Sequence, residues 1–380
     1  MLPNGRGVLS GASILAMLVG GSAALTEPLS AEASDPVRLG WMQGFPPPAE
    51  RVIGQPDADY FSFPKMRWTV CHFRELLPTK QVSRGLAAPL SLPYALDDGI
   101  DAVTFYPLGS ETPMTWAASL SENYTDGLLI LHQGHVVYEH YSGCLDERGQ
   151  HGAMSVTKSM TGLLGEILVA EGVLDEEDLV GDIVPELANS AFGNATVQQL
   201  LEMTTGLAFS ENYSDPDAEI WAYNAAASPL PKPEEYSGPR TYYEYLATVQ
   251  PDGEHGQVFG YKTINTDALG WVIARTTGES VASLLSSRLW QGVGHGARCL
   301  LYGGLDWYAV RGRRAECRAA RLGQSGAARL GRGAAQRPVT FPSGGGATYP
   351  PGGRSGSVRT SGLLYSARWE LSRHVVVTAQ

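Results

Sequence analysis

The sequence predicts a mixed fold of the α/β (α+β) class, in which an antiparallel sheet is flanked by helices. Residues 127–141 place β-branched, apolar and aromatic side chains on both sides of Gln133-Gly134, which is typical of a β-hairpin. Residues 155–172 then carry apolar side chains three or four positions apart and end at Gly172, the pattern of a helix packed on one side. Strand and helix periodicities thus follow one another within 50 residues.

The remaining elements follow in chain order. Before the hairpin, Gly44-Phe-Pro-Pro-Pro and the prolines at 89 and 93 indicate extended arms that wrap a domain. After the long helix, residues 184–187 and 196–203 predict short helices, the second capped by Thr196. Residues 209–240 read as an irregular loop, Gln257-Val-Phe-Gly as strand-like, and residues 242–249 and 265–276 as further helices.

Composition excludes several classes of partner. The chain has 380 residues, 43% of them apolar, and a net charge of −11, so it can bury a core and would repel a nucleic acid backbone. Ile14-Leu-Ala-Met-Leu-Val resembles a short signal segment, but Gly20-Gly21 interrupts it and it is too short to cross a bilayer. We therefore expect residues 1–40 to be a leader, no membrane or nucleic acid partner, and a cytoplasmic location in slight preference to a secreted one.

The last 90 residues differ from the rest. Residues 291–380 hold 13 Arg, no Lys and three acidic residues, a net charge of +10, whereas residues 1–290 carry −21. Two explanations stay open: a genuine basic low-complexity segment, or a frameshifted translation of GC-rich DNA, which we favour. Either way we expect this tail to be poorly ordered and open to trypsin near residues 311–321, with the main folded domain confined to residues 41–290.

Cysteine and histidine patterns indicate no metal centre. The four cysteines are widely spread, lack a C-x-x-C pair, and predict neither a zinc knuckle nor a disulfide framework. His132, His135, Glu139 and His140 lie on a predicted hairpin, where alternate residues face opposite sides and cannot converge. We expect no metal and no cofactor.

The positions of the five lysines exclude some catalytic classes and point to another. None of the five follows a glycine, so there is no phosphate-binding P-loop, and no G-x-S-x-G elbow is present. The pattern S-x-x-K occurs twice. Ser62-Phe-Pro-Lys65 contains a proline and precedes no helix, so it reads as chance. Ser155-Val-Thr-Lys158 opens the amphipathic helix, where both side chains share one face and the helix N-terminus offers unpaired N–H groups.

That second pattern suits nucleophilic catalysis. The Lys158 amine can accept the Ser155 hydroxyl proton only when it is neutral, which requires burial and a further polar partner. Tyr261 and Asn265 in Tyr261-Lys-Thr-Ile-Asn265 are candidates: a tyrosine can relay a proton to a leaving group and an asparagine can bond both side chains. The structural alternative is a capped helix with a surface lysine.

These residues resemble the serine hydrolases of the penicillin-recognising fold, the class C β-lactamase and esterase superfamily. Met154-Ser-Val-Thr-Lys-Ser159, Leu200-Leu-Glu-Met-Thr-Thr-Gly-Leu207 and the Tyr261 box look like its conserved stretches, in the right order. The nearest branch is that of 6-aminohexanoate-dimer hydrolase, on residues 67–78, 154–159, 211–216 and 265–271. The resemblance covers residues 40–290 and implies a β-lactamase-like fold with a helical subdomain.

The resemblance also implies roles. Ser155 would be the nucleophile, Lys158 the general base and Tyr261 the second proton-transfer residue, while Tyr213 would close over the substrate. Asn265 would contribute to substrate binding, and Asn224 replaces an acid that faces the substrate amine in the amide hydrolase. The implied activity is cleavage of a small amide or ester substrate through an acyl-enzyme.

The departures leave two alternatives open. The family's third box, K-T-G or H-x-G on a late strand, is not found, and we expect the C-terminal strands to be lost or scrambled, leaving the 127–141 hairpin with an unpaired apolar edge. The alternatives are β-lactamase or penicillin-binding activity of the same fold, and a catalytically impaired product. The oligomeric state is not predicted.

Overall fold

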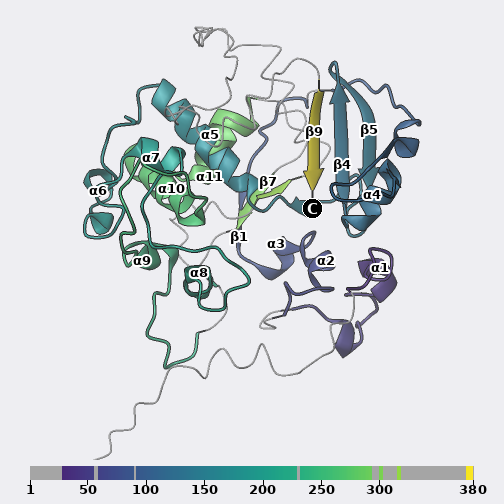
Figure 1. The fold of residues 1–380 in the computed structure, drawn as a ribbon, viewed down its shortest axis with the longest axis horizontal. Helices are drawn as coiled ribbons and strands as arrows, with labels where there is room; N and C mark the ends of the chain where they lie inside the picture. The colour runs from purple at the N-terminus through teal and green to yellow at the C-terminus, as the bar shows by residue number, and fades with distance from the viewer. Residues whose placement is uncertain are drawn as a thin grey trace, which may run out of the picture.

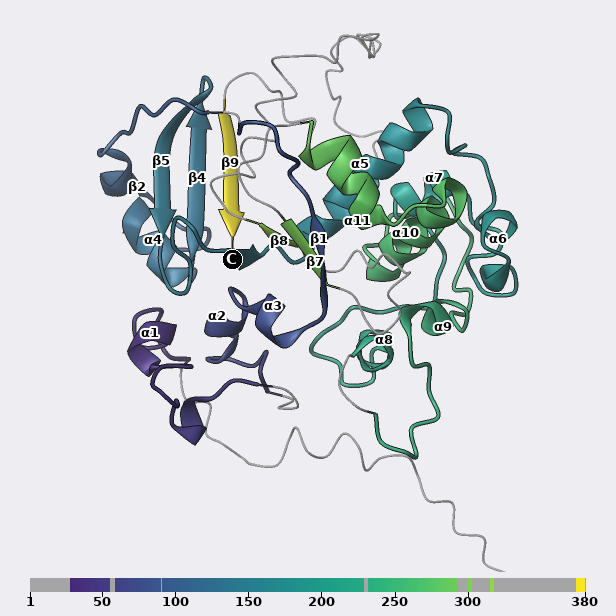
Figure 2. The ribbon, with the colours of Figure 1, turned by 180° about the vertical axis from the view of Figure 1, so that it is seen from behind.

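A computed structural model describes residues 28–54, 59–89, 91–228, 232–292, 299–302, 315–317 and 374–379. The strands β4 (Gly127–His132), β5 (His135–Tyr141) and β9 (His374–Ala379) and the helix α4 (Trp116–Glu122) form one part of the molecule, and the helices from α5 (Val156–Ala170) to α11 (Val281–Leu284) form another (Figures 1 and 2). The short N-terminal helices α1 to α3 lie below the strands in both views. The predicted signal segment and the predicted trypsin sites, apart from residues 315–317, lie outside the described residues.

The predicted hairpin is confirmed and is paired on its second edge. β4 (Gly127–His132) and β5 (His135–Tyr141) are antiparallel, and the turn places Gln133 and Gly134 at φ 50° and 81°, a backbone that glycine adopts without strain. β9 (His374–Ala379) pairs with β4 over six residues. The expectation of an unpaired edge was therefore wrong, because the Val375-Val-Val run of the tail has the β-propensity that an edge strand needs.

A second sheet joins the beginning of the domain to the region before Ser155. Its strand order is β1 (Thr79–Val82), β7 (Cys299–Tyr302), β8 (Ala315–Cys317) and β6 (His151–Gly152), all antiparallel. Two of its four strands belong to the Arg-rich tail. A third sheet pairs β2 (Thr104–Phe105) with β3 (Met114–Thr115).

The largest hydrophobic core lies in the helical part. α5 (Val156–Ala170) packs against α10 (Thr263–Thr277), with Leu164, Leu168 and Leu269 fully or almost fully buried. Both helices agree with the predicted periodicity, and α7 (Val197–Leu201) has the expected Thr196 cap, completed by the Gln199 side chain as a capping box.

The other helices are mostly single turns. They are α1 (Pro36–Leu39), α2 (Met66–Thr69), α3 (Phe73–Leu76), α4 (Trp116–Glu122), α6 (Val180–Ile183), α8 (Glu219–Ala227), α9 (Tyr242–Leu246), α11 (Val281–Leu284), three 3₁₀ turns (Ala49–Arg51, Ile100–Ala102, Pro185–Leu187) and one π-helical segment (Leu285–Trp290).

Three further sequence expectations differ from the structure. The 209–240 segment is not wholly irregular, since α8 buries Ile220 and Tyr223 against the main core; prolines and aromatic residues around it concealed its short apolar face. Gln257-Val-Phe-Gly forms bends rather than a strand. Residues 28–40, within the stretch expected as leader, include a helix and the fully buried Ser34. No helix in the described ranges is long and apolar enough to cross a membrane.

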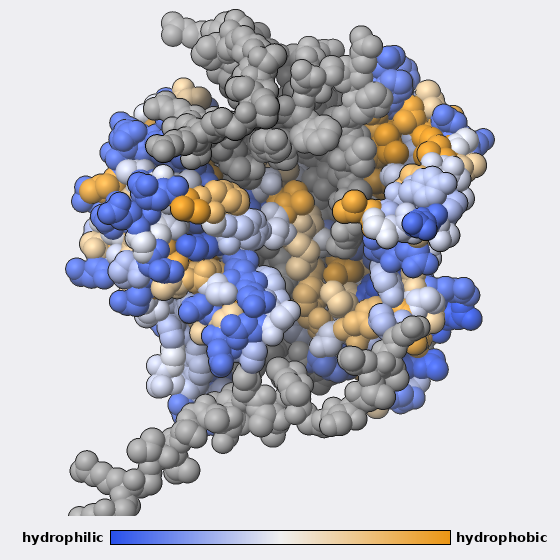
Figure 3. Space-filling model, viewed as in Figure 1, coloured by the Kyte–Doolittle hydropathy of each residue, from blue (hydrophilic) through white to orange (hydrophobic). Residues whose placement is uncertain are grey.

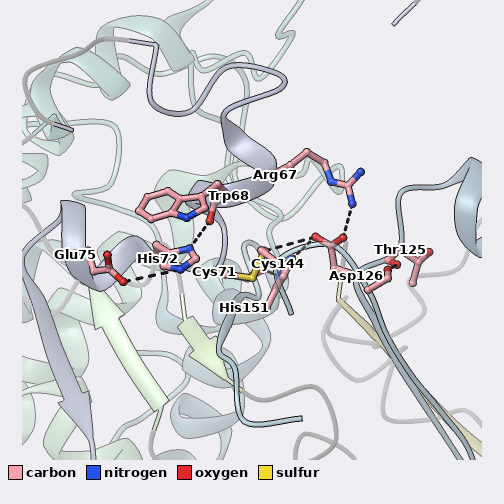
Figure 4. Close-up of a disulfide and its surroundings, with 11 residues drawn as sticks. Arg67, Trp68, Cys71, His72, Glu75, Thr125, Asp126, Cys144 and His151 are labelled. Carbon is pink, nitrogen blue, oxygen red and sulfur yellow. Dashed lines mark hydrogen bonds and ion pairs between the residues drawn. A yellow bond between two sulfur atoms is a disulfide. The ribbon is translucent and has the colours of Figure 1, made fainter. Parts of the chain in front are cut away.

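A disulfide and three buried polar residues fasten the N-terminal segment to the hairpin (Figure 4). Cys71 is bonded to Cys144, so the expectation that the cysteines form no disulfide was wrong; a separation of 73 residues hides a contact that only folding creates. Asp126 accepts a hydrogen bond from Arg67 at 2.7 Å, and its other oxygen lies 3.2 Å from Nε2 of His151. All three side chains are buried.

Candidate active site

Ser155 is the N-cap residue of α5, directly before the first helical residue. Met154, directly before it, has φ 43°, a strained value for a non-glycine residue, and Ser155 is exposed. The Ser155 hydroxyl makes no capping bond to the helix, so it remains directed outward to other partners. The strained turn therefore presents the hydroxyl at the surface, at the positive end of a 15-residue helix.

The backbone N–H groups of the first helical turn differ from the expectation. Those of Val156, Thr157 and Lys158 donate to the carbonyls of residues 153, 154 and 155, so they are not unpaired. The turn before the helix is tight enough to accept them. Within the described ranges the Ser155 N–H has no backbone acceptor, which leaves it as a donor beside the hydroxyl.

Lys158 is one turn along the same face and points back to the serine. Its Nζ donates to Ser155 Oγ at 3.0 Å, and the side chain is only 5% exposed. In the part of the chain that the structure describes, no carboxylate lies within ion-pair distance of this amine. The surface-lysine alternative is excluded by that burial.

Tyr261 comes from the segment before α10 and meets the same amine. Lys158 Nζ lies 5.1 Å from the centre of the Tyr261 ring, and the ring is 46% exposed. Ser155, Lys158 and Tyr261, three predicted site residues from two distant segments, are therefore brought together.

The loop at 203–207 holds the tyrosine segment in place. Gly260 N–H donates to the Met203 carbonyl at 2.9 Å, and Lys262 Nζ donates to the Thr205 carbonyl at 3.0 Å. Thr205 Oγ1 donates to Asn265 Oδ1 at 2.7 Å. Asn265 is fully buried, so it lies beneath the surface of the site, and its Nδ2 has no partner within the described residues. Burial lowers the pKa of Lys262.

Sequence reasoning missed His255, which braces the same loop. Its Nδ1 accepts the N–H of Gly206 at 2.9 Å, and its Nε2 lies 3.1 Å from Asn194 Oδ1. Burial lowers the pKa of His255, in agreement with a neutral ring that accepts at one nitrogen and donates at the other. A lone histidine in a turn-rich segment gave no signal that could have identified it.

Tyr213 and Asn224 lie in the segment that covers the beginning of α10. The Glu211 carboxylate accepts a hydrogen bond from the N–H of Thr263, so this segment contacts the chain two positions after Tyr261. The exposed Tyr213 ring packs edge-on against Trp221 at 5.9 Å, and Asn224 is half-buried in α8.

The surface around the site is partly apolar. Val156, Val258 and Phe259 are exposed beside Ser155 and Tyr261 in the sequence. On the face shown in Figure 3, apolar side chains gather in the hollow between the helical part and the hairpin part. The second S-x-x-K pattern offers no comparable arrangement, because Lys65 is held in an ion pair with Asp59 at 2.7 Å.

Comparisons with known proteins show similarity in both sequence and fold. The sequence is 32% identical over 240 residues to 6-aminohexanoate-dimer hydrolase of Paenarthrobacter ureafaciens, which covers 63% of this chain and 58% of that protein. The chain thus matches less than two thirds of the length of this relative. A solved structure from Bacillus anthracis, described as a candidate 6-aminohexanoate-dimer hydrolase, is similar with a TM-score of 0.66 at 25% identity, covering 74% of this chain and 72% of that one.

The match to a protein family goes further along the chain than the sequence had suggested. The Beta-lactamase family profile matches residues 121–360, which include both the Ser155 and the Tyr261 segments. The family match continues past residue 290 into the Arg-rich tail. With the fold, the site geometry and a family match over more than half of its length, the chain belongs to the Beta-lactamase family.

Proposed function

We propose that this chain is a serine hydrolase that cleaves an amide or ester bond through an acyl-enzyme on Ser155. The observation that carries the proposal is the 3.0 Å hydrogen bond from the buried Lys158 amine to Ser155 Oγ, at the N-terminus of α5. A hydroxyl with a positioned amine and a helix N-terminus has both requirements of a nucleophile: a proton acceptor, and stabilisation of negative charge.

The reaction follows from this arrangement. Lys158 Nζ takes the hydroxyl proton as Ser155 Oγ attacks the substrate carbonyl, and the positive end of α5 with the Ser155 N–H stabilises the oxyanion. Tyr261, which is about half exposed and contacts the Lys158 amine, delivers the proton to the leaving amine or alcohol. Water then attacks the acyl group by the same proton transfers in reverse, releasing the acid and restoring Ser155.

The relative's name supports the substrate class. We infer a small linear amide such as the dimer of 6-aminohexanoate, whose methylene chain suits the apolar surface beside the site. Tyr213 closes over the substrate from the segment that Glu211 anchors, and Asn224 contributes an uncharged polar group. A neutral Asn224 gives no ion pair to a substrate ammonium, so esters and neutral amides are expected to compete with the dimer.

A fluorophosphonate label tests the nucleophile. We expect one label per chain, on the peptide that contains Ser155, and none in the Ser155→Ala variant. The matched control is Ser62→Ala, which alters the other S-x-x-K serine and should be labelled normally. A label on Ser62, or no label on the wild-type chain, would overturn the proposal, and the second result would favour the catalytically impaired product.

Substrate competition separates the remaining candidates. Initial rates with the 6-aminohexanoate dimer, a p-nitrophenyl ester and a chromogenic cephalosporin should be highest for the amide or the ester. Faster turnover of the cephalosporin would instead assign the chain β-lactamase activity through the same serine.

A further inference from the structure

The disulfide lies inside a cluster of metal-ligating groups that the proposed hydrolase mechanism does not use. The two cysteine sulfurs and one ring nitrogen of His151 all lie within 4.8 Å of one another. Oδ2 of Asp126 is 3.2 Å from His151 Nε2 and 3.9 Å from the sulfur of Cys144 (Figure 4). Three potential ligands thus lie close together, and the Asp126 carboxylate adjoins two of them.

We propose that Cys71, Cys144, His151 and Asp126 form a redox-gated zinc site, closed as a disulfide when oxidised and able to hold one Zn²⁺ when reduced. Zinc prefers four tetrahedral ligands of this kind, with bonds of about 2.3 Å to sulfur and about 2.0 Å to nitrogen and oxygen. Tetrahedral angles then give a nitrogen–oxygen edge of ~3.3 Å and a sulfur–oxygen edge of ~3.5 Å. Both edges are close to the distances already present.

The main movement required is between the two sulfurs, which are bonded to each other in the disulfide and must separate to ~3.8 Å in a zinc dithiolate. Breaking the bond permits that separation by side-chain rotation, because the two cysteines are half-buried and lie on the loop after β5 and the turn after α2.

Charge favours the same assignment. Arg67 pairs with the free oxygen of Asp126 at 2.7 Å, so the buried pair is already neutral. Two thiolates and one Zn²⁺ add no net charge to this buried site, whereas two thiolates without a metal would leave two negative charges in it. Arg67 also orients the carboxylate from outside the ligand shell, as outer partners of zinc ligands commonly do.

The chemical step is an ordinary thiol–disulfide reduction. A dithiol or a phosphine supplies two electrons: the dithiol is oxidised to its own disulfide, or the phosphine and one water become the phosphine oxide and two protons. The sulfur–sulfur bond breaks and each sulfur takes up one proton. Zinc then replaces those two protons, which pass to the solvent.

The test uses the full chain, reduced with a phosphine, freed of metal and titrated with Zn²⁺ alone. We expect one zinc per reduced chain and none per oxidised chain, and we expect zinc to protect Cys71 and Cys144 from alkylation as read by peptide mass spectrometry. His151→Gln and Asp126→Asn should each lower the affinity for zinc by ~10-fold to ~100-fold. Their matched control is His72→Gln, because His72 adjoins Cys71 but bonds to Trp68 instead.

A second control separates this site from other thiols. Cys299→Ser with Cys317→Ser should leave the stoichiometry at one, while Cys71→Ser should reduce it to zero. If His151→Gln does not fold, the tetrahedral Co²⁺ spectrum of the reduced wild-type chain replaces it as the readout. Equal zinc binding by oxidised and reduced chains, binding lost only with Cys299 and Cys317, or no binding at all would overturn the proposal.

Discussion

Removal of the Cys71–Cys144 disulfide is expected to cost the fold several kcal/mol. The bond closes a loop with a sequence separation of 73 residues, and in the chain-entropy description such a loop removes about 15 cal/mol/K from the unfolded chain, or about 4.4 kcal/mol at 25 °C. A compact unfolded state reduces that figure. We therefore expect Cys71→Ala with Cys144→Ala to lower the free energy of unfolding by about 2 to 4.5 kcal/mol.

Urea denaturation with a metal chelator present measures this loss. The midpoint should fall while the slope with urea stays the same or rises slightly, since the uncrosslinked chain exposes more surface. Cys299→Ala with Cys317→Ala is the matched control, because it removes two cysteines without opening the bond. A loss below about 1 kcal/mol with an unchanged slope, or an equal loss in the control, would refute the reasoning.

Four further predictions concern the site and the hairpin. Lys158→Met should lower the acylation rate by about 100-fold to 10,000-fold with little loss of stability, and near-normal rates would contradict its role as base. Gly206→Ala should lower the free energy of unfolding by about 1 to 3 kcal/mol, because a Cβ there would meet the Gly253 carbonyl oxygen at 2.4 Å. Thermal or urea unfolding measures this loss, and an unchanged midpoint would show that the loop can move. Since burial lowers the pKa of His255, its neutral form stabilises the fold above pH 6.5 and that contribution is lost as the pH falls; His255→Gln should remove this acid dependence of the melting temperature. Burial and the bond to Asp101 raise the pKa of Tyr138 to about 12, so the stability that its neutral form contributes below pH 10 is lost as the pH rises towards 12, and Tyr138→Phe should lack that loss.

The origin of the tail also makes a prediction. If residues 291–380 come from a frameshift, resequencing the gene around codon 291 and restoring the frame should give a C-terminus with the K-T-G or H-x-G box and a less basic composition. An unaltered gene sequence would assign the tail to the protein itself.

Local patterns carried most of the correct sequence predictions. The hairpin, α5, the Thr196 cap and α10 follow from periodicity and capping residues within 20 positions of chain, where neighbouring side chains decide the conformation. The pairing of Ser155 with Lys158 was predictable for the same reason, because positions three apart share a helix face.

Contacts between distant segments could not be read from these patterns. Side-chain chemistry and the family resemblance made Tyr261 a candidate partner of Lys158, but no local pattern could show that the two side chains meet. Nothing local marked His255 or Glu211 as the residues that brace its segment. The pairing of β9 with β4 joins residues about 250 positions apart, and a short apolar run does not state its partner.

The sequence by itself determined the hairpin at residues 127–141, the helices α5 and α10, which serine has a lysine one turn away, and that an apolar domain could form. Only the tertiary structure decided that Lys158 is buried, that Asn265 lies beneath the site, and that Cys71 meets Cys144 beside His151 and Asp126. The physical reason is range: propensity and periodicity act over a few residues, whereas burial, pairing and charge compensation depend on which segments the folded core brings together.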